Sequence, residues 1–421
     1  MTELNLGTHR TFIPEQELMF LADEPVVYHC HHFNLFLDQT IDDGLGAAEG
    51  TLLRTEAAAE FSYRLLKNLC ERTNADTPPE RLQLARELFR QLGHGTLEIN
   101  ADADGGQVIG THLHYGFAWQ EKYGKKVKRH YPADAFTAGF SSAAVEIAFG
   151  LPQGSLTAKE EQCFALKDKN CVFSLKRRVP PVLDGAPVDA QSTLAVVGPP
   201  ENGIGEDVIQ PIAQGLKEFT AGVAGDERGL VQAFGVFVTM QLTGYYNRVS
   251  YDAVRRIEAK APHSVGVLEE LLRESGHVCV FNTFGGILLS PEWEGLVGPL
   301  TDDPLDILKW SIAIGRALGM GRWVIAEFEA DRRFVVRTSS SYESAYYRTR
   351  YGLADRPVEY LFQGAALAMA QLAHRVKFTE KPALTPEYYQ SLFKGGVPWQ
   401  AEQTRSIVCG DTFSEIIVTR K

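Results

Sequence analysis

Two cysteines and a glutamate lie close together in one stretch of the sequence. Cys163 and Cys171 are eight positions apart, and Glu160 stands three positions before the first of them. The polar run 167–170 between the thiols is typical of a hairpin tip, and a hairpin would bring the two thiols together. Thiolate sulfur and carboxylate oxygen both bind zinc well, at bond lengths of roughly 2.0–2.3 Å. The spacing indicates three ligands of a metal site whose fourth ligand lies elsewhere, although buried structural thiols would give the same spacing.

The residues of this stretch resemble the closing hairpin of the vinyl-4-reductase domain. The shared pattern is Glu-x-x-Cys, then a polar turn that contains Asp168, then Cys-x-Phe. The resemblance covers roughly residues 77–178. It implies a small-molecule-binding α+β module, which also forms part of the sensor region of phenol-responsive transcription activators. In that family this glutamate and these two cysteines hold a structural zinc, so the resemblance implies that Glu160, Cys163 and Cys171 bind zinc here.

The family's fourth zinc ligand, a cysteine upstream on a helix, has no counterpart in this chain. No cysteine lies between Cys70 and Cys163. His130 is the nearest chemically suitable residue, so we expect it to take the fourth position. The turn also departs slightly from the family, because its usual Gly-Asp is Lys167-Asp168 here.

Histidines form a second group, and eight of the eleven precede position 131. A strand predicted over 108–119 would place two of them, His112 and His114, on one face. We expect a second metal ion, or a polar ligand site for an acid or a tetrapyrrole, to be built from His29, His31, His94, His112 and His114. Ordinary solvated or hydrogen-bonded histidines are the alternative.

The apolar and aromatic run 26–34 contains several of these histidines and has two interpretations. As a strand it would place His29 and His31 on the same face. As the start of a buried helix it would instead pair His29 with His32. Imidazoles converge in both cases.

Helices and strands with clear end signals surround these residues. Thr77 caps a helix that has prolines in its first turn and ends at Gly93. Strands follow at 96–99 and 108–119, and an alanine-rich buried helix is predicted over 134–150. Together with the cysteine hairpin these elements predict an antiparallel sheet with helices packed on it, which is an α+β fold.

The same order of elements returns in the second half of the chain. The helix 303–319 and the strand 333–347 repeat the first helix and the second strand, with offsets that rise from about 213 to about 241 residues. In this copy Ala401, Thr404 and Asp411 stand where the first copy has its metal ligands. We therefore predict two duplicated domains: a first domain over 1–178 with the metal ligands, a Pro/Gly-rich linker over 179–208, and a degenerate second domain over 209–421.

Composition restricts the possible partners and location. The 421 residues carry a net charge of −11 without a basic block, which argues against nucleic acid as a partner. No apolar stretch approaches the length of a membrane span, and the first residues do not form a signal peptide. Six cysteines, scattered apart from the 163/171 pair, suit a reducing compartment. We expect a cytoplasmic homodimer that contacts neither nucleic acid nor membrane.

These observations lead to two hypotheses about function. The first is a small-molecule-binding or sensing protein with zinc in its first domain and a largely apolar ligand. That ligand would lie between the helix around 136–147 and the strand with His112 and His114, while Met320 and Met369 pack the second half more solidly. The second is a metal-dependent enzyme or an accessory factor of tetrapyrrole metabolism that uses the histidines. The sequence contains no Walker loop, dinucleotide-binding loop or nucleophile elbow.

Overall fold

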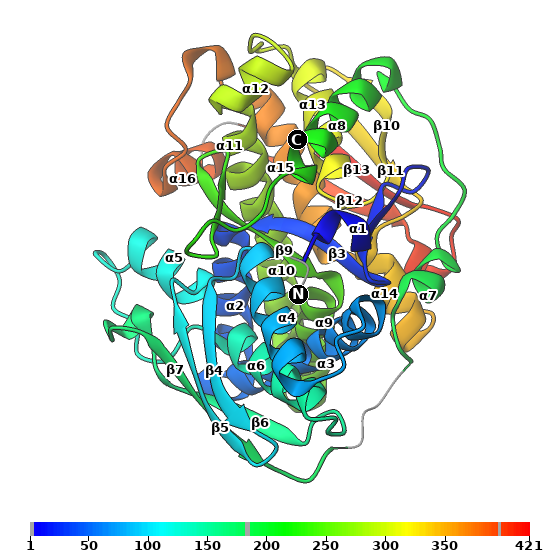
Figure 1. Cartoon of the computed structure of the whole chain (residues 1–421). Coiled ribbons are helices and arrows are strands. Elements are labelled where there is room, and N and C mark those ends of the chain that lie inside the picture. The colour runs from blue at the N-terminus through cyan, green and yellow to red at the C-terminus, as the bar shows by residue number, and fades with distance from the viewer. Residues whose placement is uncertain (1–3, 182–185, 395–396) are drawn as a thin grey trace.

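The computed structural model describes residues 4–181, 186–394 and 397–421. Within these residues, helices pack against three antiparallel sheets, so the predicted α+β class is confirmed. Residues 182–185 of the predicted linker lie outside the described residues. Figure 1 shows one four-stranded sheet at the lower left and another at the upper right, with the long helices between them.

The first half of the chain contains the elements from α1 to β7. In chain order they are α1 (Leu6–His9), β1 (Arg10–Ile13), β2 (Leu18–Leu21), β3 (Glu24–Cys30), α2 (His31–Leu45), α3 (Ala47–Thr73), α4 (Pro78–Gln91), β4 (Thr96–Asp102), β5 (Gly105–Thr111), α5 (His114–Lys122), α6 (Ala135–Ala148), β6 (Leu156–Gln162), the short 3₁₀ turn η1 (Phe164–Leu166) and β7 (Cys171–Arg177). Four of the strands form an antiparallel sheet in the order β4-β5-β7-β6.

The second half begins after the short helix α7 (Ala190–Leu194). Its elements are α8 (Glu206–Ala221), β8 (Val231–Ala233), β9 (Val236–Leu242), α9 (Thr243–Lys260), α10 (Val265–Cys279), α11 (Gly285–Leu288), α12 (Pro291–Leu296), α13 (Pro304–Ala317), β10 (Trp323–Glu329), β11 (Arg333–Thr338), α14 (Tyr342–Tyr351), α15 (Tyr360–Arg375), α16 (Pro386–Lys394), β12 (Trp399–Arg405), η5 (Ile407–Cys409) and β13 (Ser414–Arg420). Four of these strands form an antiparallel sheet in the order β10-β11-β13-β12, which is the order of the first sheet.

A third sheet joins the two halves. Its order is β1-β2-β3-β9-β8, so strands from both halves lie in one sheet, and β3 pairs with β9 with His29 opposite Thr239. Strands β3 and β9 each also contact the outer elements of the other half. The Tyr28 N–H of β3 donates to the Leu318 carbonyl at 3.0 Å, and the Met240 N–H of β9 donates to the Leu92 carbonyl at 3.0 Å. In Figure 1 the blue strand β3 accordingly lies beside the green strand β9 of the second half. The two halves are therefore interlocked.

Helix α4 has the ends that the sequence predicts. Thr77 and Glu80 form a capping box in which a carboxylate oxygen of Glu80 accepts the Thr77 N–H at 3.0 Å. Gly93 follows the helix with a φ of +89°, a left-handed conformation that favours glycine. Helix α4 packs against β4 of the first sheet. Helix α13, which Asp303 caps, packs in the same way against β10 of the second sheet.

Helix α6 confirms the predicted buried helix, and all of its residues are buried. It packs on α3, and this contact is close at Gly139, where an added Cβ would lie 2.2 Å from the carbonyl oxygen of Thr55. Helix α15 packs on α10 in the same way in the second half. Each pair of helices therefore supports one sheet.

The predicted strand 108–119 is wrong in its second part. Strand β5 ends at Thr111, and His112 adopts a left-handed φ of +54° before helix α5 begins at His114. The buried residues of α5 follow the helical spacing of 3.6 rather than the alternation of a strand. The spacing of apolar residues over 114–119 is thus the sequence signal that distinguishes this helix from a strand.

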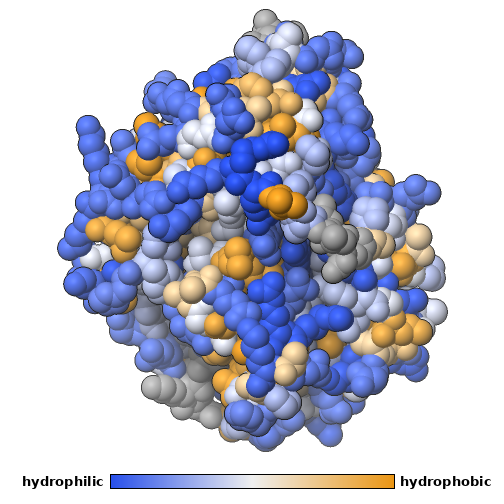
Figure 2. All heavy atoms as spheres, turned by 90° about the horizontal axis from the view of Figure 1, so that it is seen from below, coloured by the Kyte–Doolittle hydropathy of each residue, from blue (hydrophilic) through white to orange (hydrophobic). Residues whose placement is uncertain are grey.

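The surface shows no single large apolar area on the face seen from below. That face is mostly hydrophilic, with small separate apolar patches (Figure 2). Among the described residues, none of the helices is both long enough and apolar enough to cross a bilayer.

Candidate metal centre and ligand cavity

The hairpin of β6 and β7 brings Glu160, Cys163 and Cys171 together. One ligand atom of each residue lies within 4.8 Å of those of the other two, and all three residues are buried. A bulge in the pairing follows Glu160, and the turn η1 then folds Cys163 back toward Cys171 at the start of β7. Two thiols and one carboxylate at this separation could bind a metal ion.

The donor atoms have the surroundings that a metal requires. The Ala133 N–H donates to the sulfur of Cys163 at 3.3 Å, and the Phe164 N–H donates to the sulfur of Cys171 at 3.3 Å. Such hydrogen bonds orient thiolates and stabilise their charge. Oxygen Oε1 of Glu160 is buried and has no hydrogen-bond partner among the described residues. A buried carboxylate oxygen without a donor is costly, so a cation fits beside it.

Buried acids crowd one another in this cluster. Burial raises the pKa of Glu160 well above its usual value, and the neighbouring Cys163 adds to the shift. The interaction with Cys171 lowers the pKa of Cys163 to about 6 and raises that of Cys171, because one proton is shared between two thiols. A divalent cation would relieve this crowding, since it favours the deprotonated form of every ligand.

The predicted fourth ligand, His130, is not brought to this group. Its side chain is exposed, whereas the group is buried. The acid beside the group is Asp134, the N-cap residue of α6, whose N–H donates to Oε2 of Glu160 at 2.7 Å. An added Cβ at Gly116 would lie 3.4 Å from both Oδ2 of Asp134 and the sulfur of Cys171, so carboxylate and thiol face the same small space.

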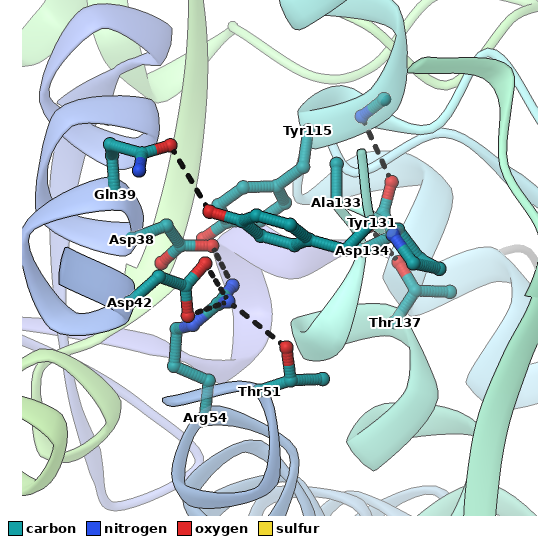
Figure 3. A network of polar contacts seen from close by, with 12 residues as sticks. Asp38, Gln39, Asp42, Thr51, Arg54, Tyr115, Tyr131, Ala133, Asp134 and Thr137 are labelled. Carbon is teal, nitrogen blue, oxygen red and sulfur yellow. Dashed lines mark hydrogen bonds and ion pairs between the residues drawn. The ribbon is translucent and has the colours of Figure 1, made fainter. Parts of the chain in front are cut away.

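Asp134 is fully buried, and Figure 3 shows its carboxylate held by Thr137 and a main-chain N–H. The Thr137 hydroxyl donates to it at 2.6 Å and the Gly116 N–H at 3.0 Å. Burial raises the pKa of Asp134 to about 7, and Cys163 adds to the shift. Asp134 was not predicted as a ligand, because a cysteine or a histidine was expected in the fourth position. An aspartate directly before a predicted helix was the available signal.

A buried ion-pair network lies next to Asp134 (Figure 3). The Arg54 guanidinium contacts Asp38 and Asp42 at 2.6 Å each, and its side chain is fully buried. Burial raises the pKa of Asp38 to about 6 although Arg54 opposes the shift. The Tyr245 hydroxyl, from helix α9 of the second half, donates to Asp38 at 3.2 Å. The network therefore joins three helices and both halves of the chain.

The five predicted histidines do not converge on one point. His112 is exposed, and His31, the first residue of α2, accepts the Phe237 N–H at 3.2 Å. The run 26–34 is strand up to Cys30 and helix from there on, so neither of its two interpretations is right throughout. Among the described residues, the Glu160, Cys163 and Cys171 trio is the one group of three or more metal-ligating side chains.

Two of the histidines, His94 and His114, do lie together in the core of the first half. Their ring centroids are 6.3 Å apart. The Asn34 amide donates to Nε2 of His114 at 2.9 Å and its oxygen accepts the Tyr246 hydroxyl at 2.5 Å. Neither ring nitrogen of His94, nor Nδ1 of His114, makes a hydrogen bond of good geometry within the described residues. Burial lowers the pKa of His114 to about 3 and that of His94 well below its usual value, which the main chain of Met240 partly opposes.

The burial of His114 predicts a pH dependence of stability. The folded state keeps this imidazole neutral down to a pKa of about 3, whereas the unfolded chain protonates it near pH 6.5. The unfolded state therefore binds a proton that the folded state does not bind. The stability that the neutral His114 contributes is lost as pH falls below about 6.5. Between pH 7.5 and 5, we expect wild type to lose about 2 kcal/mol relative to a His114→Gln variant, because each pKa unit is worth about 1.4 kcal/mol.

Urea unfolding at several pH values measures this difference. The comparison with the variant is required because other groups also change stability with pH. Burial raises the pKa of Glu343 to about 8, so this residue adds stability as pH falls, opposite to His114. His112→Gln, which changes an exposed imidazole, is the matched control and should give the wild-type slope. Parallel curves for wild type and His114→Gln would contradict the prediction.

The space predicted for a ligand in the first half is filled by rings. His94 stacks on Phe136 with centroids 4.5 Å apart, and Phe140 lies 4.8 Å from Phe89. A cavity lies instead in the second half, where Met320 and Tyr342 hold the positions of His94 and His114 after α13 and at the start of α14. At this place the second half has Ala365 where the first half has Phe140, and the smaller side chain leaves a small gap, so the expected denser packing of the second half stays a prediction.

His29 from β3 reaches into this cavity from the first half. Its Nδ1 lies 3.2 Å from the sulfur of Cys279 and its Nε2 lies 3.2 Å from the Tyr342 hydroxyl. The cavity measures about 20 Å³, which is room for about one water. Met320 and Phe33 form parts of its apolar wall.

Burial disfavours the charged form of each titratable group around the cavity. Burial lowers the pKa of His29 to about 3, raises that of Glu343 to about 8, and raises those of Cys279 and Tyr342 well above their usual values. The Leu361 N–H donates to the Glu343 carboxyl at 3.0 Å. The cavity therefore joins apolar walls to hydrogen-bonding groups whose charged forms are disfavoured, a make-up that suits an uncharged ligand.

Comparisons with known proteins find a structural likeness. No family model matches the chain, and no curated protein matches it. Among solved structures, the chain is similar to the phenol-responsive sensory domain of the transcription activator PoxR, crystallised with phenol. The identity is 16% and the TM-score is 0.33, and the match covers 41% of this chain and 87% of that chain.

Proposed function

We propose that this protein binds a small, uncharged and largely apolar molecule, and that its first half is stabilised by a zinc ion. The cavity lined by His29, Tyr342, Cys279 and Glu343 carries the proposal for the ligand, because it joins apolar walls to a few neutral hydrogen-bonding groups. The imidazole of His29 is the polar anchor. Binding would displace the Met320 side chain, since a single aromatic ring needs a cavity on the order of 150 Å³.

Zinc would be held by Glu160, Cys163, Cys171 and Asp134. The buried, unpartnered oxygen of Glu160 and the thiols with their N–H donors support the first three. The buried carboxylate of Asp134 supports the fourth, in place of His130. When bound, zinc would cross-link the β6–β7 hairpin to the start of α6, and its binding free energy would add to the folding free energy.

An internal duplication accounts for the architecture. The two outer sheets have the same strand order. In the first half the helix after the N-terminal hairpin leads to two further helices, two strands, two helices and a closing hairpin, and the second half has the same order with α11, α12 and α16 added. We propose that the chain consists of two copies of one α+β unit whose N-terminal hairpins meet in the third sheet. This proposal also accounts for the position of Met320 and Tyr342 relative to His94 and His114.

Binding of single-ring probes tests the ligand proposal. We expect phenol to bind wild type and benzoate not to bind, because a carboxylate would lose its hydration in an apolar cavity. His29→Leu should weaken phenol binding roughly tenfold through the lost hydrogen bond, whereas Met320→Ala, which enlarges the cavity, should strengthen it. Isothermal titration measures these affinities.

The exposed His112→Ala provides a matched control whose affinity should equal that of wild type. Equal affinity of wild type and His29→Leu, or equal binding of phenol and benzoate, would show that the cavity is not the ligand site.

A further inference from the structure

The closing hairpin of the second half has the same local geometry as the metal hairpin of the first. Both have a pairing shift at one position, Glu160 in β6 and Gln403 in β12. The Cys163 N–H donates to Asp168 at 2.8 Å, and the Ser406 N–H donates to Asp411 at 2.9 Å. These pairs show which residues of the two hairpins correspond.

The remaining correspondences follow from the next residues. The Phe164 N–H donates to the sulfur of Cys171, and the Ile407 N–H donates to the hydroxyl oxygen of Ser414 at 3.0 Å. Asp134 precedes α6 as Glu359 precedes α15. Gln403, Ser406, Ser414 and Glu359 therefore hold the positions of Glu160, Cys163, Cys171 and Asp134. The correspondence read from the sequence, with Ala401, Thr404 and Asp411, is wrong by two or three residues.

In the second half, the other three residues each donate a hydrogen bond to Glu359. The Glu359 carboxylate accepts Gln403 Nε2 at 2.8 Å, the Ser406 hydroxyl at 2.6 Å and the Ser414 hydroxyl at 2.5 Å. The Ser344 hydroxyl donates to it as well, at 3.0 Å. Glu359 and the three serines are buried. One carboxylate thus collects four donors from three elements of the fold.

The two clusters have opposite chemistry at the same place. In the first half, Glu160, Cys163 and Cys171 converge with Asp134 beside them, and such a set of acidic groups is complementary to a cation. In the second half, hydroxyl and amide donors converge, and such a set is complementary to an anion. We propose that the Glu359 carboxylate replaces the metal in the second half, so that the chain binds one zinc and the second half keeps its structure without metal. The proposal for the stoichiometry rests on the proposed zinc site, whereas the role of Glu359 does not.

This arrangement separates the ligand cavity from the metal. Glu359 is the N-cap residue of α15, and the first turn of that helix supplies Leu361 and Phe362, which line the cavity. Their N–H groups donate to Glu343, another residue of the cavity wall. Removal of zinc should therefore loosen the β6–β7 hairpin and leave both the β12–β13 hairpin and the cavity intact.

Hydrogen exchange of the full-length chain tests the inference. On removal of zinc by a chelator, we expect amides of β6 and β7 to exchange at least tenfold faster and those of β12 and β13 to be unchanged. The Glu359→Gln variant replaces the carboxylate by a side-chain amide that faces other hydrogen-bond donors. The main-chain amides of β12 and β13 should therefore exchange at least tenfold faster, while the zinc content stays as in wild type. Glu402→Gln, at an exposed neighbouring carboxylate, should have neither effect.

A variant with Gln403→Glu, Ser406→Cys and Ser414→Cys provides a second, independent measurement. Together with Glu359 it recreates the donor set of the first half, so the variant should bind two zinc ions per chain instead of one. A folded variant with one zinc would overturn the correspondence, and protection of β12 and β13 that survives Glu359→Gln would overturn the role of the carboxylate. If wild type bound no zinc, the zinc proposal would fail, but the result of Glu359→Gln would still decide whether this carboxylate holds the second half.

Discussion

Replacing Cys163 or Cys171 by serine is expected to release the metal ion and to lower the free energy of unfolding by several kcal/mol. The two thiols are buried within 4.8 Å of each other and of Glu160, so each would supply the proposed zinc with a ligand that a serine hydroxyl cannot replace at neutral pH. Binding to a preformed group of buried ligands adds directly to folding stability, because the unfolded chain has no such group. Elemental analysis and urea unfolding of untagged protein measure the two effects.

Other variants show whether the right ligands have been identified. Cys409→Ser, in the corresponding hairpin of the second half, should keep the metal content of wild type. Asp134→Ala should reduce metal affinity, whereas His130→Ala, at an exposed side chain, should not. Equal metal loss in Cys409→Ser, or a larger loss in His130→Ala than in Asp134→Ala, would show that the site has been assigned to the wrong residues.

Replacing Arg54 by methionine should lower the free energy of unfolding by about 3–5 kcal/mol, the usual cost of removing one partner from a buried ion pair. The substitution keeps the apolar stem of the side chain but removes the guanidinium from between Asp38 and Asp42, so that only Arg129, 3.8 Å from Asp42, remains as a cation beside these buried carboxylates. Both carboxylates then have to become protonated or draw in water. Chemical denaturation measures the loss.

A compensating variant separates charge from packing in this network. Adding Asp38→Asn and Asp42→Asn to Arg54→Met removes the unpaired charges and should recover part of the lost stability. Arg86→Met, at an arginine that bonds only to Gln83 among the described residues, should change stability by less than about 0.5 kcal/mol. A loss below about 1 kcal/mol in Arg54→Met would mean that the network does not hold the helices together.

Local signals in the sequence were sufficient for the elements with strong ends. Thr77 and Glu80 at one end of α4, and Gly93 at the other, identify this helix because capping depends on adjacent residues. The hairpin with Cys163 and Cys171 was predictable for the same reason, since its strands are separated by a short polar turn. The α+β class followed from the order of such elements.

Contacts between distant residues were not predictable from one sequence. Asp134 is a ligand candidate because α6 starts beside the hairpin, and that placement depends on packing rather than on spacing. His114 left the predicted strand face because the chain turns at His112, where a non-glycine residue takes a left-handed conformation. The cavity formed in the second half because Phe140 fills the corresponding space of the first, a difference of side-chain volume that periodicity does not report.

The shared third sheet also has a consequence for the order in which the chain can fold. The core of the first half needs Tyr245 and Tyr246, and the hydrogen bond from Tyr246 to Asn34 joins residues 212 positions apart. During synthesis the first half therefore cannot complete its core until more than half of the chain has left the ribosome. Contacts this distant in sequence slow folding and leave apolar surface open meanwhile. A protein of this design would depend on chaperones more than two independent domains of the same length would.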